Sequence, residues 1–420
     1  MIIKAVTNVL LEHAKKIQNI LQNLKDCVQK LVDIYAKSFR VNFSMELNND
    51  AQDLGTPKET IHVQESLCLR ICALHRLPAD WKHDEYCVSY QIYHGTKPIA
   101  EPIQTVYQPS SKSFFDRVLF DAWLESNSVL ICGLPREARL VLTLYARDVV
   151  TEDKQKKIVH TELGWTSLQL FNFERFLSQG TFLLNLWPSE AEKQIGPAPD
   201  SGSHPYADKC PLLSIELPNQ LGHPVIFPVN VPFQSPPRSD YNFQDLDYYT
   251  QQELLDVCDQ DFISFTELRP QDREVLWEKR HYLGDIPGAL PKVLLAANNW
   301  DFASLPGLYG LLKTWTRPEP MDVLQLFLPC FPDTYVREVA ISWLKEVSND
   351  DFVDYLPQLL EALKHETWSA SNLAKLMLER SLESPRVSHN LYWLLAQSLP
   401  GLSPQVRTIF SFFANFVFFT

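Results

Sequence analysis

The chain has 420 residues, of which 45% are hydrophobic and 21% are charged, and its net charge is −13 at pH 7. This length is sufficient for two or three domains that each bury a core. The negative charge excludes a general basic field, so we predict no nucleic-acid partner, and contact with anionic lipid would need a local basic patch.

The eight cysteines are dispersed and form no C-x-x-C pair. This distribution favours a reduced intracellular environment over a disulfide framework. Lys4 and Glu12 interrupt the apolar N-terminal run, which argues against a signal peptide. No segment approaches the roughly 20 apolar residues of a membrane span. We therefore expect a cytoplasmic protein, with peripheral membrane association as a further option.

The first segment, residues 1–50, is predicted to form a helix and a linker. Between residues 5 and 36 the apolar side chains recur three and four positions apart, as on one face of a helix. Two interpretations are open: the helix packs on a neighbouring domain, or it forms a coiled coil with a partner.

From about residue 60 the apolar period changes to two, which predicts β-strands. ETIHVQESLCLRICAL places Ile61, Val63, Leu67, Leu69 and Ile71 on one face. EYCVSYQIY, RLVLTLYA and LLSIELP repeat this alternation. The spacing predicts an antiparallel β-sandwich over residues 60–230.

Turn and loop formers separate these strands. We predict turns at His94-Gly95, Leu134-Pro135, Gly164 and Gly180. The proline-rich stretch 188–211 is predicted to be a loop. A second proline-rich stretch begins at residue 225, and we assign 231–249 as the linker to the next domain.

After about residue 250 the period is helical, and residues 250–400 are predicted to form a stack of antiparallel helix pairs, an α-solenoid. Asp333 is placed to cap the helix of FPDTYVREVAISWL. Pro357 would remove a backbone donor inside a helix, so we predict that it begins a new one.

Three runs in this region resemble the helical (PIK) domain of phosphoinositide 3-kinases: FPDTYVREVAISWL, YLPQLLEALKHE and SHNLYWLLAQSL. FDAWLESN, GLPREARLVLTLYA and LGWTSLQLFNFERFLSQGTFLLNLWP resemble the C2 domain of the same family. VLWEKRHYLG is most similar to class II members, and the resemblance covers about residues 60–400. Asn172 departs from the usual Asp of this pattern.

The resemblance implies an ATP- and Mg²⁺-dependent lipid kinase family that phosphorylates the 3-position of phosphatidylinositol lipids. The kinase motifs themselves are missing from this sequence, because no Asp-Phe pair is followed by Gly and no G-x-G occurs. LPGLYGLLKTW is predicted to be a helix rather than a nucleotide loop. We therefore expect no catalytic residue and no cofactor in this chain, with a kinase domain as its partner in longer forms. Residues 401–420 are expected to be a divergent Phe-rich tail.

Two loop regions bear on ligands of the C2 domain. Asp80 and Asp84, with Asp148 and Asp153 in another loop, are too few for a multi-oxygen calcium site, so we expect no metal. His365-Glu366 lacks the second histidine of an H-E-x-x-H zinc site.

Lys154, Lys156 and Lys157 form a small basic run on a predicted loop, with Arg136 and Arg139 not far away in sequence. We assign these lysines to a weak contact with phosphoinositide membranes, the alternative being a solvated loop.

The resemblance implies the scaffold and membrane- or partner-contact portion of a class II phosphatidylinositol 3-kinase, whose full-length relatives act in phosphoinositide signalling and membrane traffic. The alternative is a non-catalytic interaction protein with a helical-repeat peptide-binding surface. The identity of protein partners and the lipid preference do not follow from the residues.

Overall fold

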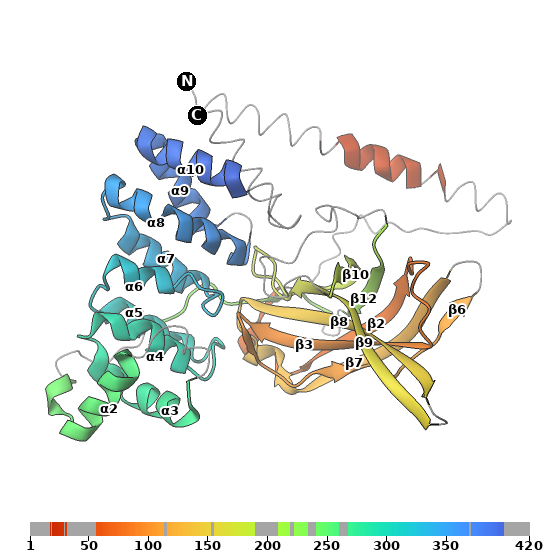
Figure 1. Ribbon diagram of the computed structural model, residues 1–420, viewed down its shortest axis with the longest axis horizontal. Helices are drawn as coiled ribbons and strands as arrows, with labels where there is room; N and C mark the ends of the chain where they lie inside the picture. Colours follow the sequence, from red (N-terminus) through yellow and green to blue (C-terminus); the bar gives the residue numbers. More distant parts are fainter. Residues whose placement is uncertain are drawn as a thin grey trace. The chain divides into compact units, whose positions relative to one another are not determined.

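The computed structural model describes residues 17, 19–28, 30–31, 56–112, 116–152, 155–189, 209–218, 222–233, 241–259, 268–368 and 371–398. The chain divides into two compact units, Met1–Leu54 and Gly55–Thr420. In the first unit the described residues are helical, which confirms that part of the predicted helix (red in Figure 1). Its apolar stripe is exposed at Ile17, Ile20, Leu21, Leu24, Val28 and Leu31.

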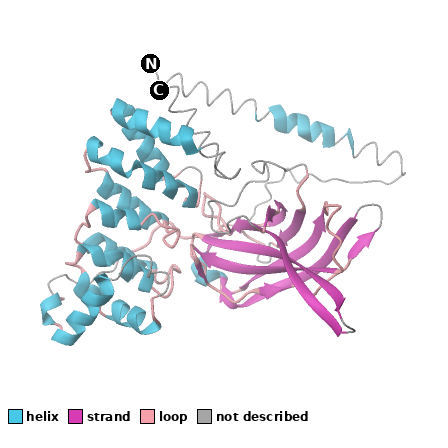
Figure 2. Cartoon of the chain, viewed as in Figure 1, coloured by secondary structure: helices cyan, strands magenta, loops and turns pink. Residues whose placement is uncertain are grey.

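The second unit begins with the predicted antiparallel sandwich (magenta in Figure 2). One sheet contains, in spatial order, β10 (Gly180–Asn185), β12 (Leu212–Leu217), β2 (Ser66–His75), β7 (Asp116–Leu130) and β6 (Ser110–Lys112). The other contains β11 (Trp187–Pro188), β9 (Gln155–Gln169), β8 (Ala138–Glu152), β3 (Glu85–His94) and β4 (Lys97–Pro98), and β5 (Ile103–Gln104) also pairs with β3. β1 (Lys58–Glu59) pairs in parallel with β13 (Val225–Ile226).

Alternation places the core side of β2 as predicted, with Leu67, Leu69 and Ile71 buried and the two cysteines Cys68 and Cys72 on the opposite face. The prediction was wrong for the residues before Ser66. The strand breaks at the 3₁₀ turn η1 (Thr60–His62), where Ile61 is exposed. Val63 packs instead in a small cluster with Ile131, of the turn η2 (Ile131–Gly133), and Val225.

Gly164 was predicted to mark a turn, and this was wrong. It lies inside β9, opposite Leu144, where the register of β8 and β9 shifts. A Cβ at this position would lie 2.4 Å from the carbonyl oxygen of Trp187 in β11. Close approach of the neighbouring strand therefore requires glycine here. The turn predicted at His94-Gly95 is confirmed, and Gly95 has φ +61°.

The helical part of the second unit follows the sandwich. Its helices are α2 (Tyr248–Asp259), α3 (Pro270–Glu278), α4 (Leu290–Ala296), α5 (Leu305–Thr314), α6 (Pro320–Gln325), α7 (Thr334–Leu344), α8 (Asn349–Ala362), α9 (Asn372–Glu383) and α10 (Pro385–Ser398). Short 3₁₀ turns lie between or before them: η5 (Phe243–Asp245), η7 (Arg280–Leu283), η8 (Pro287–Ala289) and η9 (Leu363–His365). Figure 1 shows successive helices layered in chain order, which confirms the predicted stack. None of the described helices is both long and apolar enough to cross a bilayer.

Pro357 does not begin a helix, contrary to the prediction. It lies inside α8, which runs continuously from Asn349 to Ala362. The side chain of Pro357 is exposed, so the ring and the missing donor face solvent. Packing holds the helix through this position, because Phe352 and Leu356 before it and Leu359 after it are all fully buried.

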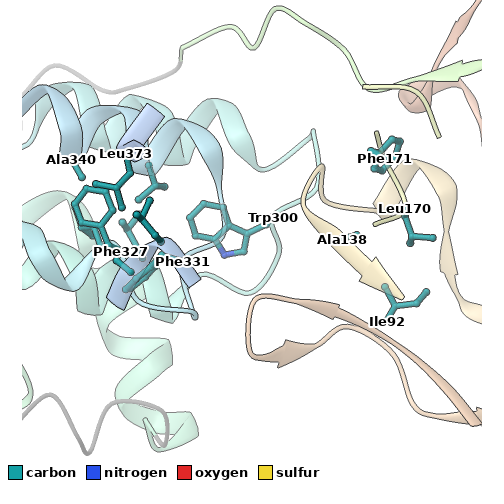
Figure 3. Packing of buried hydrophobic residues seen from close by; sticks show 14 of the residues in the cluster. Ile92, Ala138, Leu170, Phe171, Trp300, Phe327, Phe331, Ala340 and Leu373 are labelled. Atoms are coloured by element: carbon teal, nitrogen blue, oxygen red, sulfur yellow. The ribbon is translucent and has the colours of Figure 1, made fainter. Parts of the chain in front are cut away.

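The cores of the sandwich and the helices form one continuous hydrophobic cluster. Figure 3 shows Ile92, Ala138, Leu170 and Phe171 of the sandwich and Trp300, Phe327 and Phe331 of the helical part within it. Phe227, in the proline-rich stretch that begins at residue 225, also belongs to this cluster, while Val225 packs in the small cluster with Val63. The assigned domain limits stay a prediction. Most of the 188–211 loop and the whole of 401–420 lie outside the described residues.

Candidate functional site: the interface between sandwich and helices

The N-terminus of α7 carries two acidic caps, one from each part of the second unit. Asp333 Oδ1 accepts a hydrogen bond from the backbone N of Val336 at 2.9 Å, as predicted for an N-cap residue. Glu137, just before β8, accepts from the backbone N of Thr334 at 3.2 Å and from its hydroxyl at 2.7 Å. A residue of the sandwich therefore satisfies a donor that the first turn of α7 leaves unpaired.

Both carboxyl groups are buried, and burial is the main cause of their raised pKa values. The pKa of Asp333 is raised to about 7 by burial and then by the nearby charge of Glu137. The Tyr309 hydroxyl donates to Asp333 Oδ2 at 2.9 Å and partly offsets this shift. Burial also raises the pKa of Glu137, against the opposing charge of Arg136. The interface thus concentrates acidic groups where water is excluded.

Gly95, at the turn between β3 and β4, touches the backbone that leads into α7. A Cβ at Gly95 would lie 2.5 Å from the carbonyl oxygen of Pro329 and 3.0 Å from Cδ of Pro332. No side chain fits in this space, and φ of +61° is also unfavourable for any residue with a Cβ. This turn therefore fixes how closely the sandwich approaches the helices.

A third contact lies beside the same turn. The ring of His94 packs against Trp300 with centroids 5.4 Å apart. Burial, followed by the charge of Lys97, lowers the pKa of His94 to about 3, so this ring is neutral at cellular pH. Lys97 Nζ donates to the carbonyl oxygens of Asn298 at 3.0 Å and Ala297 at 3.4 Å. The lysine thereby joins β4 to the backbone after α4.

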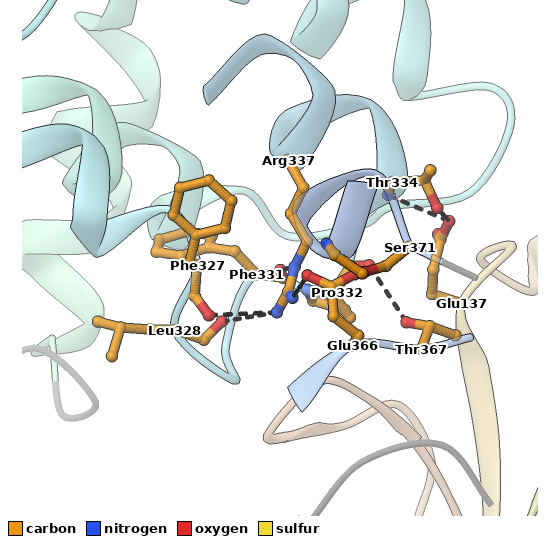
Figure 4. A network of polar contacts seen from close by, with 11 residues as sticks. Glu137, Phe327, Leu328, Phe331, Pro332, Thr334, Arg337, Glu366, Thr367 and Ser371 are labelled. Atoms are coloured by element: carbon orange, nitrogen blue, oxygen red, sulfur yellow. Dashed lines mark hydrogen bonds and ion pairs between the residues drawn. The ribbon is translucent and has the colours of Figure 1, made fainter. Parts of the chain in front are cut away.

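Two of the runs that resemble the PIK domain contact each other around Arg337 (Figure 4). The guanidinium of Arg337 is buried and donates to the carbonyl oxygens of Phe331, Phe327 and Leu328. Its Nη1 also pairs with Glu366 Oε1 at 2.7 Å. FPDTYVR and ALKHE are thus joined by a buried ion pair that holds α7 against the turn after α8.

Two family models match the chain on either side of this interface. "Phosphoinositide 3-kinase C2" matches residues 82–204, and "Phosphoinositide 3-kinase family, accessory domain (PIK domain)" matches residues 244–414. Among curated proteins, the human phosphatidylinositol 4-phosphate 3-kinase C2 domain-containing subunit beta is 32% identical over 93% of this chain. The alpha subunit from Pongo abelii is 31% identical over 96%, and the rat phosphatidylinositol 3-kinase C2 domain-containing subunit gamma is 29% identical over 91%.

The chain carries the C2 and helical domains of the class II phosphoinositide 3-kinases. It spans about a quarter of the length of these relatives, 24% in each case. At the departure from the usual Asp, Asn172 Oδ1 accepts a hydrogen bond from the backbone N of Phe176 at 2.9 Å. An amide oxygen serves here as well as a carboxylate.

The basic run of the C2 domain lies near the tip of the β8–β9 hairpin. Lys154 lies outside the described residues, while Lys156 and Lys157 belong to β9 and pair in register with Thr151 and Val150. The pairing of β8 with β3 ends at Arg147, so the hairpin continues beyond the sheet as a two-stranded arm (Figure 1). Two of the three lysines therefore lie in a strand and not in the loop that the sequence predicted.

Arg136 and Arg139 do not join this basic run. Arg139 pairs with Gln169 at the far end of the hairpin, twelve positions from Thr151, which is roughly 40 Å along a strand. Arg139 is buried, and Arg136 stacks on Trp368 of the helical domain with 4.3 Å to the ring centroid. The long strand therefore separates these arginines from the lysines, although they are not far away in sequence.

Two of the four carboxylates weighed for calcium come together in the C2 domain. Asp148 Oδ2 contacts His83 Nδ1 at 2.7 Å, and Asp148 Oδ1 accepts from the backbone N of Asp84 at 3.1 Å. Asp84 Oδ2 accepts from the backbone N of Val149 at 2.9 Å. These oxygens tie the base of the arm together, and Asp153 lies outside the described residues. Within the described part of the chain, no group of three or more metal-ligating side chains occurs.

Sequence reasoning missed Glu137 and the partners of Gly95. Glu137 and Thr334 are 197 positions apart, and neither pattern carries a local signal for the other. Gly95 was recognised as a turn residue, but its contact with Pro329 follows only from packing. One signal was available in the sequence. Glu137 lies in GLPREARL, directly before a strand of buried residues, so its carboxylate would need a hydrogen-bond donor from another part of the fold.

Proposed function

We propose that this chain is the scaffold of a class II phosphoinositide 3-kinase that holds a membrane-facing C2 domain in one orientation against its helical domain. The hydrogen bonds from Thr334 to Glu137 carry this proposal, because they place a sandwich carboxylate on the N-terminus of a stack helix. The glycine contact at Pro329 and the shared hydrophobic core support the same fixed orientation.

A fixed orientation matters for a lipid kinase because its substrate is confined to a surface. A catalytic domain that rests on the helical stack would then keep one height and tilt above a membrane bound by the C2 domain. ATP and Mg²⁺ would be bound by that catalytic domain, as in the longer family members. α10 offers a candidate contact for it, since Trp393 is 52% exposed on a helix whose Leu391 and Leu395 are buried.

The arm of β8 and β9 is the proposed membrane contact. Beside the backbone positions of Lys156 and Lys157, its apolar side chains Val149, Ile158 and Val159 are exposed by 45%, 53% and 38%. Basic charge attracts an anionic surface by about 1 kcal/mol per residue, and exposed apolar side chains add favourable burial in the interfacial region.

Vesicle sedimentation tests this proposal. Wild-type chain should bind vesicles of phosphatidylcholine with 20% phosphatidylserine, and the double substitution Lys156→Glu/Lys157→Glu should weaken binding at least about tenfold. The control is Lys345→Glu/Lys375→Glu, which reverses two lysines on the surface of the helical stack that are 55% and 70% exposed. Equal loss in both variants would point to net charge alone and would refute a role for the arm.

A further inference from the structure

A cavity of about 390 Å³ lies between the C2 and helical domains, beside the first residues of α7 and α9. Basic and polar side chains from both domains line it, among them Arg136, Arg175, Arg337, Trp368, Ser371 and Asn372. Figure 4 shows three of these lining residues, Arg337, Thr367 and Ser371. Its volume is in the range of small-molecule sites.

Two hydrogen-bond donors of this cavity are buried without a partner among the described residues. They are Nη1 of Arg136 and Nε1 of Trp368. The rest of the Arg136 guanidinium is well held, since Nη2 donates to the carbonyl oxygen of Phe173 at 3.1 Å and the plane stacks on Trp368. Buried donors are almost always paired in proteins, so these two N–H groups are available to an acceptor bound in the cavity.

The arginine charge on this side of the cavity is only partly offset, by the nearby Glu137, whose charge opposes the effect of burial on the pKa of Arg136. In the part of the chain that the structure describes, neither Arg136 nor Arg175 forms an ion pair. Arg175 donates to the carbonyl oxygens of Pro228 and Val229 instead. Burial lowers the pKa of Arg136, which shows that its charge is poorly solvated. An anion in the cavity would relieve this cost.

The acidic side chains of the cavity are already engaged elsewhere. Glu366 pairs with Arg337 at 2.7 Å. Glu338 Oε1 accepts from Asn372 Nδ2 at 2.9 Å. Neither carboxylate is therefore directed to Arg136 or Trp368.

The N-terminus of α9 supplies further donors to the same space. Ser371 Oγ accepts from the backbone N of Ala374 at 3.1 Å, which satisfies the third amide of the helix. The amides of Asn372 and Leu373, which both line the cavity, have no partner within the helix by its geometry. Amides at a helix N-terminus favour anions, and phosphate in particular.

We propose that this cavity binds a phosphate group carried by a small polar molecule, with Arg136 and Trp368 as the donors and α9 as the helical end. A guanidinium fork matches the oxygens of a phosphate, which favours this anion over chloride. A phosphate alone would not fill 390 Å³, so the remaining volume is left for the polar body that carries it. That body is either a free phosphorylated polyol or the headgroup of a phosphorylated lipid. The site is independent of the proposed membrane arm.

Titration calorimetry on the full chain tests this inference, with inorganic phosphate and inositol hexakisphosphate as soluble probes and chloride at equal ionic strength as the salt control. Wild type should bind the phosphate probes and not chloride. Arg136→Gln should weaken binding at least about tenfold, because a charge-assisted hydrogen bond is lost. Trp368→Phe keeps an aromatic ring under Arg136 and removes only the N–H, so it should weaken binding about three- to tenfold.

The matched control is Arg386→Gln, which removes an arginine that is 59% exposed and pairs with Asp350 outside the cavity. It should bind phosphate as wild type does. Thermal unfolding without phosphate identifies any variant that fails to fold. If Arg136→Gln fails to fold, Trp368→Phe still tests the proposal. Equal affinity of wild type and Trp368→Phe, or no binding of any phosphate probe by wild type, would overturn the proposal.

Vesicles distinguish the two sources of the phosphate. Vesicles of phosphatidylcholine with 10% phosphatidylinositol 4-phosphate, compared with phosphatidylcholine alone, report on lipid headgroups. Loss of this binding in Trp368→Phe would assign the site to a lipid headgroup. Vesicle binding that is unchanged in Trp368→Phe, together with weakened binding of inositol hexakisphosphate, would assign it to a soluble phosphate ester. Lys156→Glu/Lys157→Glu should not change the affinity of the chain for the soluble phosphate probes. The proposal for the membrane arm and the proposal for the cavity can therefore be refuted separately.

Discussion

Thr334 donates two hydrogen bonds to one carboxylate oxygen of Glu137, from its backbone N at 3.2 Å and from its hydroxyl at 2.7 Å. The sandwich thereby caps a helix of the neighbouring stack. Negative charge at a helix N-terminus is favourable, which adds to the hydrogen bonds. This contact joins the C2 domain to the helical domain at the N-terminus of α7.

A double-mutant cycle should measure this contact. Glu137→Ala is expected to lower the free energy of unfolding by about 1–3 kcal/mol, and Thr334→Val by about 1 kcal/mol. Because each change removes the same contact, the double variant should lose at least about 0.5 kcal/mol less than the sum. Chemical denaturation provides the measurement.

The control for this cycle is Thr314→Val combined with Glu137→Ala. The hydroxyl of Thr314 bonds to the carbonyl of Gly310 within α5 and takes no part in the interface. These two changes should add, whereas additivity of Glu137→Ala and Thr334→Val would contradict the capping role.

Gly95→Ala should destabilise the second unit by about 2–4 kcal/mol, because a Cβ cannot fit 2.5 Å from the carbonyl oxygen of Pro329. Gly222→Ala is a matched control, since Gly222 also has a positive φ, +67°, but no heavy atom lies within 4 Å of its added Cβ. It should cost only about 1 kcal/mol of backbone strain. Equal losses of unfolding free energy would show that φ alone explains the effect of Gly95→Ala.

Stability should depend on pH through Asp333. Its pKa is raised to about 7 from the ordinary value of 3.8, so the folded state favours the protonated carboxyl. The contribution of this protonated carboxyl to the free energy of unfolding is fully present below about pH 4 and is lost as the pH rises through 7. Asp333→Asn stays neutral and still caps α7, so it should stabilise the protein relative to wild type more at pH 8 than at pH 4.5.

The expected difference between these two pH values is roughly 2–4 kcal/mol, the linkage of about three pKa units. Urea denaturation at a series of pH values measures it. Parallel stability curves for wild type and Asp333→Asn would show that the carboxyl is not protonated in the folded protein.

Arg337→Met should be among the most damaging single substitutions in the helical domain, at about 3–5 kcal/mol of unfolding free energy. It leaves Glu366 buried without its cation and removes donors to the carbonyls of Phe331 and Phe327. Arg386→Met breaks an ion pair whose partners are 59% and 77% exposed, and should cost at most about 1 kcal/mol. A comparable loss in the two variants, measured by chemical denaturation, would argue against the buried clamp.

The sequence by itself determined most of the elements and the resemblance to a family. Alternating side chains were enough for β2, β3, β8 and β12, because a strand reveals its buried face within a few residues. Asp333 was predictable as a cap because its hydrogen bond reaches only three positions along the chain. The runs that resemble the PIK domain were recognisable because each is a continuous stretch of sequence, such as FPDTYVR with Arg337 and ALKHE with Glu366.

Only the tertiary structure decided what depends on distant packing. Pro357 continues a helix because the buried stripe on both sides outweighs one lost hydrogen bond. Gly164 lies within a strand because Trp187 passes too close for a Cβ. The lysines lie at one end of the β8–β9 hairpin and Arg139 lies at the other, although these residues are near each other in sequence. Glu137 meets Thr334 only because the core shared by both domains brings residues 197 positions apart within hydrogen-bond distance, and local periodicity carries no record of such a contact.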